Sequence, residues 1–290
     1  NTSNPVRLAA LYSRLSGLVR EFRPDVVDCH RGESFFLWGL LKLAGARAGK
    51  GFRLVRTRGD QRPPRGSFGN RLLHNRVADA VIVTNSRMRT HFLTRMAMPP
   101  ERLHLIVGGV DRSRFRFDAA GRDRVRREFG YAPEDFVLGL LGRFDLVKGQ
   151  RETIQAVADL YHRQGRRDIR LLLIGFPTAT TQAEIESWIE ECQIRAITRI
   201  TGDRPDVVAC ISALDLGVVA SLGSETIARA ALEIMSCGVP LIGTDVGVMP
   251  DLLSPAALFA PADPAALVRS ALPLLTAPDR LRDLLAGQSR

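Results

Sequence analysis

The amino-acid sequence predicts an α/β fold with doubly wound layers, in which parallel strands lie between helices. Short apolar runs of strand length alternate with longer segments of helical period along most of the 290 residues. Glycine and polar residues follow many of these runs, as expected where strands end in turns. The chain is long enough for two domains of ordinary size, and no run of about 18 apolar residues indicates a membrane span.

The first half of the chain alternates between helix and strand from its start. Leucines at a helical spacing open it, and Pro24 then breaks the pattern before a short apolar run. The predicted helices are 6–22, 34–46, 70–77 and 87–96, and the predicted strands are 26–29, 52–56, 80–83 and 103–107.

Two polar tetrapeptides follow predicted strands in this half. HRGE occupies residues 30–33 and TRGD occupies residues 57–60. Parallel sheets bind ligands at the carboxyl ends of their strands. These stretches are therefore candidate ligand contacts, although a structural role is also consistent with a single histidine such as His30.

The second half repeats the alternation with longer and more apolar strands. The run 135–141 is almost wholly apolar, as in a sheet that is covered on both faces. The predicted helices are 118–129, 152–162, 183–193, 207–214, 264–275 and 279–285, and the predicted strands are 135–141, 170–175, 197–201, 214–220, 239–243 and 256–259.

A basic loop follows the strand 135–141. It reads Gly-Arg-x4-Lys-Gly, with Arg143 and Lys148 as its two cations. Two solvated surface cations would explain the pattern. Alternatively, the pair neutralises a pyrophosphate, with backbone donors from the start of the next helix nearby. Gly175, after the strand 170–175, would allow the backbone to approach a ligand closely.

Two glutamates mark the segment after the strand 214–220. Ser224 can cap a helix that runs to Cys237, with Glu225 at its start and Glu233 eight residues later. Eight residues span about 12 Å and nearly two turns, so both carboxylates would face the same way. Glu225 could simply complement the helix dipole. Glu233 lies among apolar residues and needs a partner, for which a ligand hydroxyl is a candidate.

The spacing Glu-x7-Glu before Cys-Gly-Val-Pro, together with Gly-Arg-x4-Lys-Gly, resembles the retaining glycosyltransferases of family 4, which have the GT-B fold. PDVVD at 24–28, ADAVIVTNS at 78–86 and GGVDRSRF at 108–115 are similar to landmarks of that family's acceptor domain. The resemblance implies two Rossmann-like domains, an acceptor-side domain over 1–117 and a donor-binding domain over 118–290. The family usually begins with strands that precede PDVV, so we expect the first domain to be truncated at its N-terminus.

The resemblance assigns roles to individual residues. Arg143 and Lys148 would hold the donor diphosphate, Glu225 would lie beside the donor sugar, and Glu233 would hold the nucleotide ribose. Arg58 stands where many members have a histidine that reaches the donor sugar, and Gly108 replaces an asparagine. The implied donor-site residues are Gly142, Arg143, Lys148, Gly175, Arg204, Ser224, Glu225, Thr226 and Glu233, and the acceptor-side candidates are His30, Arg31, Arg58 and Asp60.

The family activity is the transfer of a sugar from a nucleotide-diphosphate sugar to an acceptor hydroxyl, with retention at the anomeric carbon. The segment 221–253 most resembles bacterial members that build lipopolysaccharide or other envelope glycans, so the implied acceptor is a glycolipid or an envelope glycan. No Asp-x-Asp motif stands at the end of a strand, so we expect no metal and no other cofactor, with cations stabilising the leaving diphosphate.

Charge is concentrated in the first part of the chain. Residues 1–118 hold 22 Lys and Arg against 9 Asp and Glu, a net charge of +13. This excess is compatible with solubility alone and with attraction to an anionic partner. For an envelope enzyme the partner is the anionic inner face of the membrane. Phe35, Phe36 and Trp38 are candidate shallow contacts with it, although their pattern favours a place in the buried core. We expect a cytoplasmic protein that is peripheral on the membrane. Four widely spaced cysteines are typical of a reducing compartment.

Two other functions are compatible with parts of the sequence. A sugar-nucleotide epimerase of the GT-B fold would share the donor motifs but would turn over its substrate without an acceptor. A basic nucleic-acid-binding protein would explain the charge. However, the arginines are scattered over several elements and not gathered on one recognition helix, so we expect no nucleic-acid partner.

Overall fold

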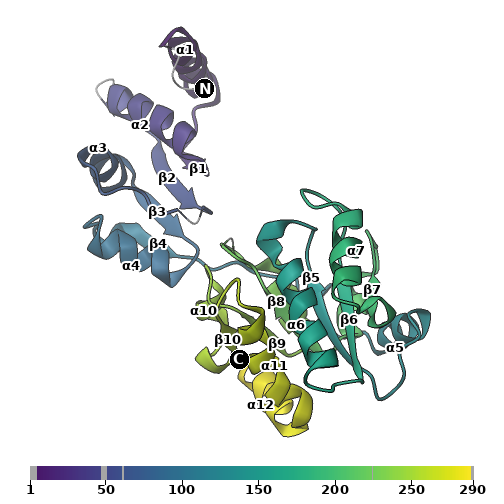
Figure 1. The fold of residues 1–290 in the computed structure, drawn as a ribbon. Helices are drawn as coiled ribbons and strands as arrows, with labels where there is room; N and C mark the ends of the chain where they lie inside the picture. Colours follow the sequence, from purple (N-terminus) through teal and green to yellow (C-terminus); the bar gives the residue numbers. More distant parts are fainter. Residues whose placement is uncertain (1–4, 47–50, 61, 224, 289–290) are drawn as a thin grey trace. The chain divides into compact units, whose positions relative to one another are not determined.

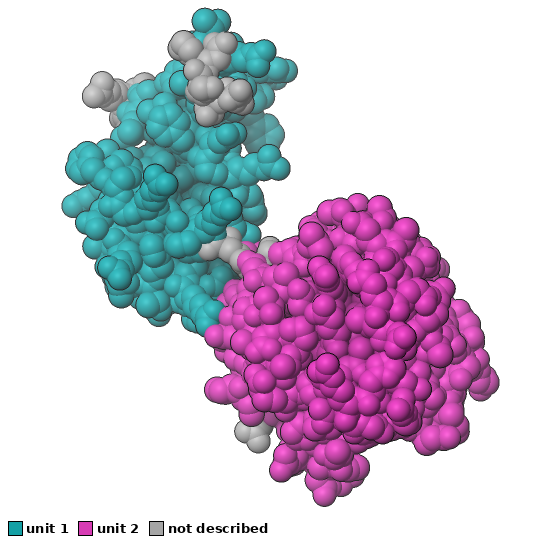
Figure 2. Space-filling view, viewed as in Figure 1, with its two compact units in different colours: residues 1–107 teal, residues 108–290 magenta. Residues whose placement is uncertain are grey.

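The structure is a computed structural model that describes residues 5–46, 51–60, 62–223 and 225–288. The chain divides into two compact units, Asn1–Val107 and Gly108–Arg290, shown in separate colours in Figure 2. Each unit has its own parallel sheet and its own buried apolar core. The α/β class with parallel sheets, predicted from the sequence, is confirmed.

The first unit contains a four-stranded parallel sheet in the order β1-β2-β3-β4 (Figure 1). Because neighbouring strands follow one another in sequence, right-handed crossovers place their connecting helices on one face. Its elements are α1 (Pro5–Phe22), β1 (Val26–Cys29), α2 (Gly32–Ala46), β2 (Arg53–Arg58), α3 (Phe68–Leu72), a π-helical turn η1 (Leu73–Val77), β3 (Ala80–Val83), α4 (Ser86–Thr94), η2 (Pro100–Arg102) and β4 (Leu103–Leu105).

The helices of the first unit begin at side-chain caps that the sequence supplies. The Asn85 side chain accepts a hydrogen bond from the Met88 backbone at the start of α4. Ser67 does the same for α3 through the Asn70 backbone. Each cap satisfies a backbone donor that the first helical turn leaves unpaired.

The second unit contains a six-stranded parallel sheet in the order β10-β9-β8-β5-β6-β7. Its strands are buried along nearly their whole length, in keeping with their apolar sequences. Its elements are α5 (Ala119–Glu128), β5 (Phe136–Leu141), η3 (Leu146–Lys148), α6 (Gln150–His162), β6 (Ile169–Ile174), α7 (Gln182–Glu191), η4 (Arg195–Ile197), β7 (Thr198–Ile200), α8 (Val207–Ser212), β8 (Leu216–Val219), α9 (Arg229–Ser236), β9 (Leu241–Thr244), α10 (Met249–Leu252), η5 (Pro255–Ala257), β10 (Leu258–Phe259), α11 (Pro264–Thr276) and α12 (Pro278–Gln288).

The segment 108–117 lies with the second unit, whereas the sequence placed the domain division after residue 117. Phe115 is buried in the core of the second unit. The Ser236 hydroxyl donates a hydrogen bond to the Phe115 carbonyl over 2.5 Å. These contacts tie the segment to α9.

The helix that carries Glu233 is shorter than predicted. The sequence predicted a helix from residue 225 to residue 237, but α9 begins at Arg229. Ala228 has a left-handed backbone with φ of 53°, which a helix cannot continue through. None of the described helices combines the length and the apolar character that crossing a bilayer would require.

Candidate active site

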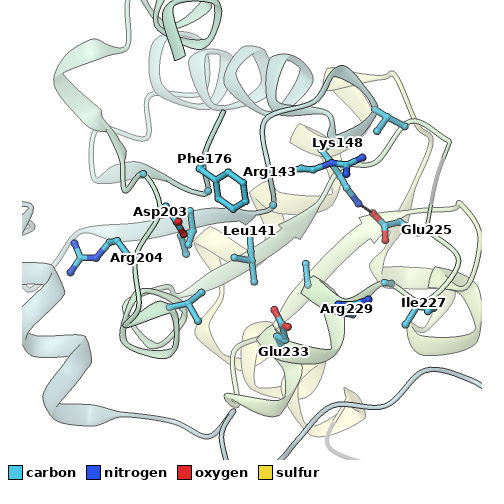
Figure 3. A pocket seen from close by; sticks show the side chains of 18 of the residues that line it. Leu141, Arg143, Lys148, Phe176, Asp203, Arg204, Glu225, Ile227, Arg229 and Glu233 are labelled. Atoms are coloured by element: carbon cyan, nitrogen blue, oxygen red, sulfur yellow. Dashed lines mark hydrogen bonds and ion pairs between the residues drawn. The ribbon is translucent and has the colours of Figure 1, made fainter. Parts of the chain in front are cut away.

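A pocket of about 670 Å³ lies in the second unit at the carboxyl ends of β5, β6 and β7 (Figure 3). The loop before α9 and the first turns of α9 close its other side. This is the edge where parallel α/β sheets bind ligands. Its lining residues are Leu141, Gly142, Arg143, Val147, Lys148, Ile174, Gly175, Phe176, Gly202, Asp203, Arg204, Val207, Glu225, Thr226, Ile227, Ala228, Arg229, Ala230 and Glu233.

An ion pair crosses one end of this pocket. The Lys148 Nζ atom lies 2.5 Å from the Glu225 Oε1 atom, and the dashed line in Figure 3 marks the contact. The Ser221 hydroxyl donates to the same carboxylate oxygen over 2.5 Å. Only 7% of the Glu225 side chain is exposed, against 24% of the Lys148 side chain. The carboxylate is therefore held rigidly, while the ammonium group remains accessible from the pocket.

Arg143 lies near Lys148 and remains half-exposed (Figure 3). Its Nη2 atom lies 3.1 Å from the Asp145 carboxylate. The Arg143 carbonyl accepts a hydrogen bond from the buried Gln150 side chain, which anchors the loop backbone. The strand end thus presents two cations to the pocket, as the sequence predicted from the loop pattern.

Two glycines allow this loop to contact its neighbours. Gly149 has φ of 73°, and a Cβ atom there would meet the Ala220 carbonyl oxygen at 2.1 Å. A Cβ atom on Gly175 would meet the Gly142 carbonyl oxygen at 2.0 Å. Neither position accommodates a side chain. The close approach predicted for Gly175 is therefore made to the Gly142 backbone, at a point that also lines the pocket.

Glu225 lies in the loop before α9 and not in its first turn. Its carbonyl accepts a hydrogen bond from the Val248 backbone over 2.8 Å, which pins the loop to the segment after β9. The helix dipole therefore does not account for its position. Thr226 lines the pocket next to it. Ser224, the predicted cap and donor-site residue, lies outside the described residues.

Glu233 projects from α9 toward the pocket (Figure 3). Burial raises the pKa of its carboxyl group, while the positive charges of Arg114 and Arg229 lower it to a smaller extent. Its carboxylate has no hydrogen bond or ion pair among the described residues. A half-buried carboxyl group without a partner is suited to accept a ligand hydroxyl.

Arg204 lines the pocket, but its guanidinium group is engaged within the protein. It binds Asp206 over 2.8 Å and Glu128 over 2.6 Å, and these hydrogen bonds raise its pKa above the usual value. In Figure 3 its side chain points away from the other labelled residues. Its contribution to the pocket wall therefore comes from its backbone and alkyl chain, and its role as a donor contact remains a prediction.

The sequence did not single out several pocket residues. Phe176 exposes part of its ring at the end of β6, Asp203 follows β7, and Arg229 opens α9. Phe176 and Asp203 could have been identified by their position, because each follows a predicted strand as Arg143 does.

The candidates after β1 in the first unit lie on its surface. His30 is exposed, and its Nε2 atom lies 3.1 Å from the Asp28 carboxylate. Arg31 is exposed just before α2. Both side chains are available to a ligand.

The candidates at the end of β2 differ in exposure, because Arg58 is buried and Asp60, which pairs with it, is exposed. Arg58 is almost fully buried, and its Nη2 atom lies 2.5 Å from the Asp60 carboxylate and donates to the Arg62 carbonyl. Arg56, which the sequence analysis did not select, is wholly buried. It donates to the Cys29 carbonyl over 2.7 Å, and its guanidinium group lies over the Phe35 ring.

A buried histidine lies near these two arginines. His74 lies between the rings of Phe35 and Phe92, and its Nδ1 atom contacts the Asn70 carbonyl at 2.8 Å. Burial is the main reason why its pKa is lowered to about 4; the hydrogen bond with Asn70 opposes this shift, and the nearby positive charges of Arg58 and Arg56 add to it. His74 is therefore neutral at physiological pH.

Among the described residues no group of three or more His, Cys, Asp and Glu side chains is placed to hold a metal ion. The expectation of a metal-independent reaction remains a prediction.

Two family models match separate parts of the chain. The model described as Glycosyltransferase Family 4 matches residues 1–114, and the model described as Glycosyl transferases group 1 matches residues 135–277. Each match falls almost wholly within one compact unit.

The alignments with curated relatives cover about half of this chain or slightly more. A D-inositol 3-phosphate glycosyltransferase from Rhodococcus opacus is 27% identical over 175 residues, which are 59% of this chain and 39% of the relative. The protein of the same name from Jonesia denitrificans is 30% identical over 176 residues, 58% of this chain and 41% of the relative. The matched part thus spans about two fifths of these relatives.

Solved structures show the same fold at low sequence identity. Anabaena HepE in complex with UDP matches with a TM-score of 0.81 and 20% identity, covering 98% of this chain and 77% of HepE. The lipopolysaccharide outer core galactosyltransferase WaaB matches with a TM-score of 0.69 and 16% identity, covering 98% of this chain and 76% of WaaB. These structural matches show the GT-B fold, and the two family models together show that the chain belongs to the family 4 and group 1 glycosyltransferases.

Proposed function

We propose that this chain forms the core of a retaining glycosyltransferase that takes a sugar from a nucleotide-diphosphate sugar. The sugar is transferred to an acceptor hydroxyl on a glycolipid or another envelope glycan, such as lipopolysaccharide. The observation that carries the proposal is the pocket at the ends of β5 to β7, where Arg143 and Lys148 face a held carboxylate, Glu225.

The two cations supply what the departing diphosphate needs. When the bond between the anomeric carbon and the diphosphate breaks, negative charge grows on the phosphate oxygens. A guanidinium and an ammonium group at one strand end stabilise that charge without a metal ion. The new bond to the acceptor oxygen forms on the face that the diphosphate leaves, and the acceptor proton passes to the departing phosphate.

The two glutamates have different tasks in this scheme. Glu225 is fixed by Lys148 and Ser221, so its free oxygen can orient a sugar hydroxyl next to the diphosphate. Glu233 is half-buried with a raised pKa and no protein partner, and a ribose hydroxyl would satisfy it.

The acceptor is proposed from the resemblance to envelope enzymes and from the basic first part of the chain. The net charge of +13 over residues 1–118 favours a cytoplasmic protein that works on the anionic membrane surface. Because the curated relatives are D-inositol 3-phosphate glycosyltransferases, a phosphorylated polyol is the alternative acceptor. A screen of both acceptor classes with one labelled donor distinguishes them.

The donor site is tested by calorimetry with UDP, GDP and ADP against the matching nucleosides. Arg143→Ala and Lys148→Ala should each weaken diphosphate binding by about 1.5–3 kcal/mol, the range for charged hydrogen bonds. Nucleoside binding should change much less. Arg127→Ala is the matched control, because Arg127 is an exposed arginine of α5 outside the pocket.

Equal losses for nucleoside and diphosphate would contradict the phosphate assignment. Donor turnover should also persist in excess EDTA, because the cations take the place of a metal. A loss of turnover that Mg²⁺ restores would show that the site needs a metal.

A further inference from the structure

Two groups bind the same carboxylate oxygen in the candidate active site. The Lys148 Nζ atom and the Ser221 hydroxyl each lie 2.5 Å from the Glu225 Oε1 atom. The two partners differ in exposure, because Ser221 is almost wholly buried whereas the Lys148 side chain borders the pocket. A ligand in the pocket therefore reaches the lysine and does not reach the serine.

The backbone around Ser221 is fixed on both sides. The buried Thr244 hydroxyl, at the end of β9, donates a hydrogen bond to the Ser221 carbonyl over 2.7 Å. The next residue, Leu222, donates through its backbone N–H to the Val147 carbonyl over 2.8 Å. These bonds hold the Ser221 hydroxyl beside Glu225 independently of the lysine.

The charge of Lys148 lies at the end of a flexible chain that can change its partner. Its Cγ and Cδ atoms pass over Gly142, where even an added Cβ atom would lie 3.9 Å from both. Figure 3 shows this side chain extending from the loop after β5 to Glu225. The Glu225 side chain is only 7% exposed, so the ammonium group is the member of the pair that a ligand can draw away.

A diphosphate and Glu225 compete for this ammonium group. If Lys148 held both, two anions would share one positive charge in a partly buried site, where Coulomb energies are larger than in water. A lysine that moves onto the diphosphate separates the two anions. The buried carboxylate then keeps Ser221 as its remaining side-chain partner among the residues that the structure describes.

We propose that Ser221 is a positioning residue, which keeps the Glu225 carboxylate in place while Lys148 exchanges this carboxylate for the donor diphosphate. This role rests on the proposed function, because it takes the diphosphate as the ligand of Lys148. An ammonium group has three N–H donors, so the competing arrangement is a lysine that bridges the carboxylate and the diphosphate.

Calorimetry with inorganic pyrophosphate separates exchange from bridging. In Ser221→Ala the exchange leaves a buried carboxylate without a partner, so pyrophosphate binding should weaken by about tenfold. In the Glu225→Gln background the same serine substitution should change the affinity by less than about twofold, because no charge remains to be satisfied. An equal loss in both backgrounds would restrict Ser221 to supporting the fold, and no loss in either would indicate a bridging lysine. Both outcomes overturn the proposal.

Ser212→Ala is the matched control for the serine substitution. Ser212 is wholly buried in α8, and its hydroxyl accepts a hydrogen bond from the Asp118 backbone over 3.0 Å, outside the pocket. This variant should bind pyrophosphate as wild type does. Melting curves show whether both serine variants are folded.

Nuclear magnetic resonance of the lysine side chains follows the exchange without any change at Ser221. The chain has three lysines, Lys42, Lys50 and Lys148, so isotope labelling of lysine gives few signals, which Lys→Arg variants assign. The Lys148 signals of free wild type and free Glu225→Gln should differ, because the variant lacks the ion pair.

With saturating pyrophosphate, the Lys148 signals of these two proteins should converge, because the lysine no longer contacts position 225. Signals that remain different would show bridging and refute the exchange. Lys42 is the internal control, since it pairs with Asp79 in the first unit, and its signal should not move.

Failure of the donor site has a separate signature. If pyrophosphate, UDP, GDP and ADP all leave the Lys148 signal unmoved, the diphosphate assignment is wrong and the exchange falls with it. If the signal moves but wild type and Glu225→Gln do not converge, the donor site stands and the exchange alone is wrong.

Discussion

In each unit, two basic side chains and a carboxylate lie near the end of a central strand, but the cations are buried in one unit and border a pocket in the other. In the first unit, Arg56 and Arg58 on β2 are buried beside Asp60 and donate to carbonyls of their own unit. In the second unit, Arg143 and Lys148 follow β5 and border an open pocket. A position at a strand end therefore does not by itself make a cation a ligand contact.

The cations differ in burial because two of them lie within a pleated strand and the other two lie beyond the end of one. Successive residues of a strand face opposite sides, so Arg56 and Arg58 share the buried face of Leu54. Arg143 and Lys148 lie beyond the last paired residue of β5, where alternation no longer directs the side chains inward. The comparison predicts stability effects in the first unit and binding or turnover effects in the second.

The largest expected effect is on folding of the first unit. Arg56→Ala removes a wholly buried guanidinium group and leaves the Cys29 carbonyl without its donor. The free energy of unfolding should fall by about 3–5 kcal/mol, as when one partner of a buried charged network is lost. Calorimetric unfolding of the first unit measures it.

Arg53→Ala is the control for this substitution, because Arg53 is exposed on the same strand. A small and equal change in both variants would mean that the buried arginine is dispensable. Diphosphate binding by the second unit should persist in both.

The next effect is a pH dependence that His74 confers on the first unit. Its folded pKa of about 4 lies below the ordinary 6.5, so the unfolded chain binds a proton that the folded chain excludes. Stability is therefore full above pH 6.5 and falls as pH drops from 6.5 to 4, by about 3 kcal/mol in total. Melting temperatures across this pH range measure the loss.

His74→Phe should flatten this pH dependence, because Phe cannot take up a proton between Phe35 and Phe92. His30→Gln is the control, since His30 is exposed, and should leave the slope in place. If the slope survives in His74→Phe, another group is responsible for it.

The smallest effect in free energy concerns turnover. Glu225→Gln keeps the size of the side chain but removes the charge that Lys148 and Ser221 hold in place. Diphosphate binding should persist while turnover of the donor falls at least tenfold, about 1.4 kcal/mol in the barrier. Glu190→Gln, on the exposed face of α7, makes the same chemical change outside the pocket and should have no effect. Unchanged turnover in Glu225→Gln would restrict Glu225 to a structural role.

The sequence predicted most strands and helices well, because long apolar runs and helical periods dominate their formation. Strands 26–29 and 80–83 have the predicted bounds. The start of α9 was wrong, since the left-handed Ala228 and the contact between Glu225 and Val248 depend on tertiary packing. A residue pattern does not reveal such a loop.

For the candidate site, the sequence identified Arg143, Lys148, Glu225 and Glu233, and the structure brings all four to one pocket. It did not show that Arg204 would be engaged by Glu128, because an acid that is distant in the chain is not visible in a local motif. The second partner, Asp206, lies only two residues after Arg204. The burial of Arg56 could have been predicted from the sequence. Side chains alternate between the two faces of a strand, so Arg56 lies on the same face as Leu54.

The close contacts at Gly149 and Gly175 also affect how far the loop after β5 can move when a diphosphate binds. The loop after β5 is joined to its neighbours by backbone bonds, from Gly142 to Ile174, from Phe144 to Phe176 and from Leu222 to Val147. A loop fastened on both sides moves with the sheet and does not act as a lid. The amide hydrogens of Gly142 and Phe144, which donate to β6 and to the residues after it, should exchange with solvent as slowly as those of β5. Diphosphate should reach the cations of the loop at the rate of simple encounter, without a preceding loop closure.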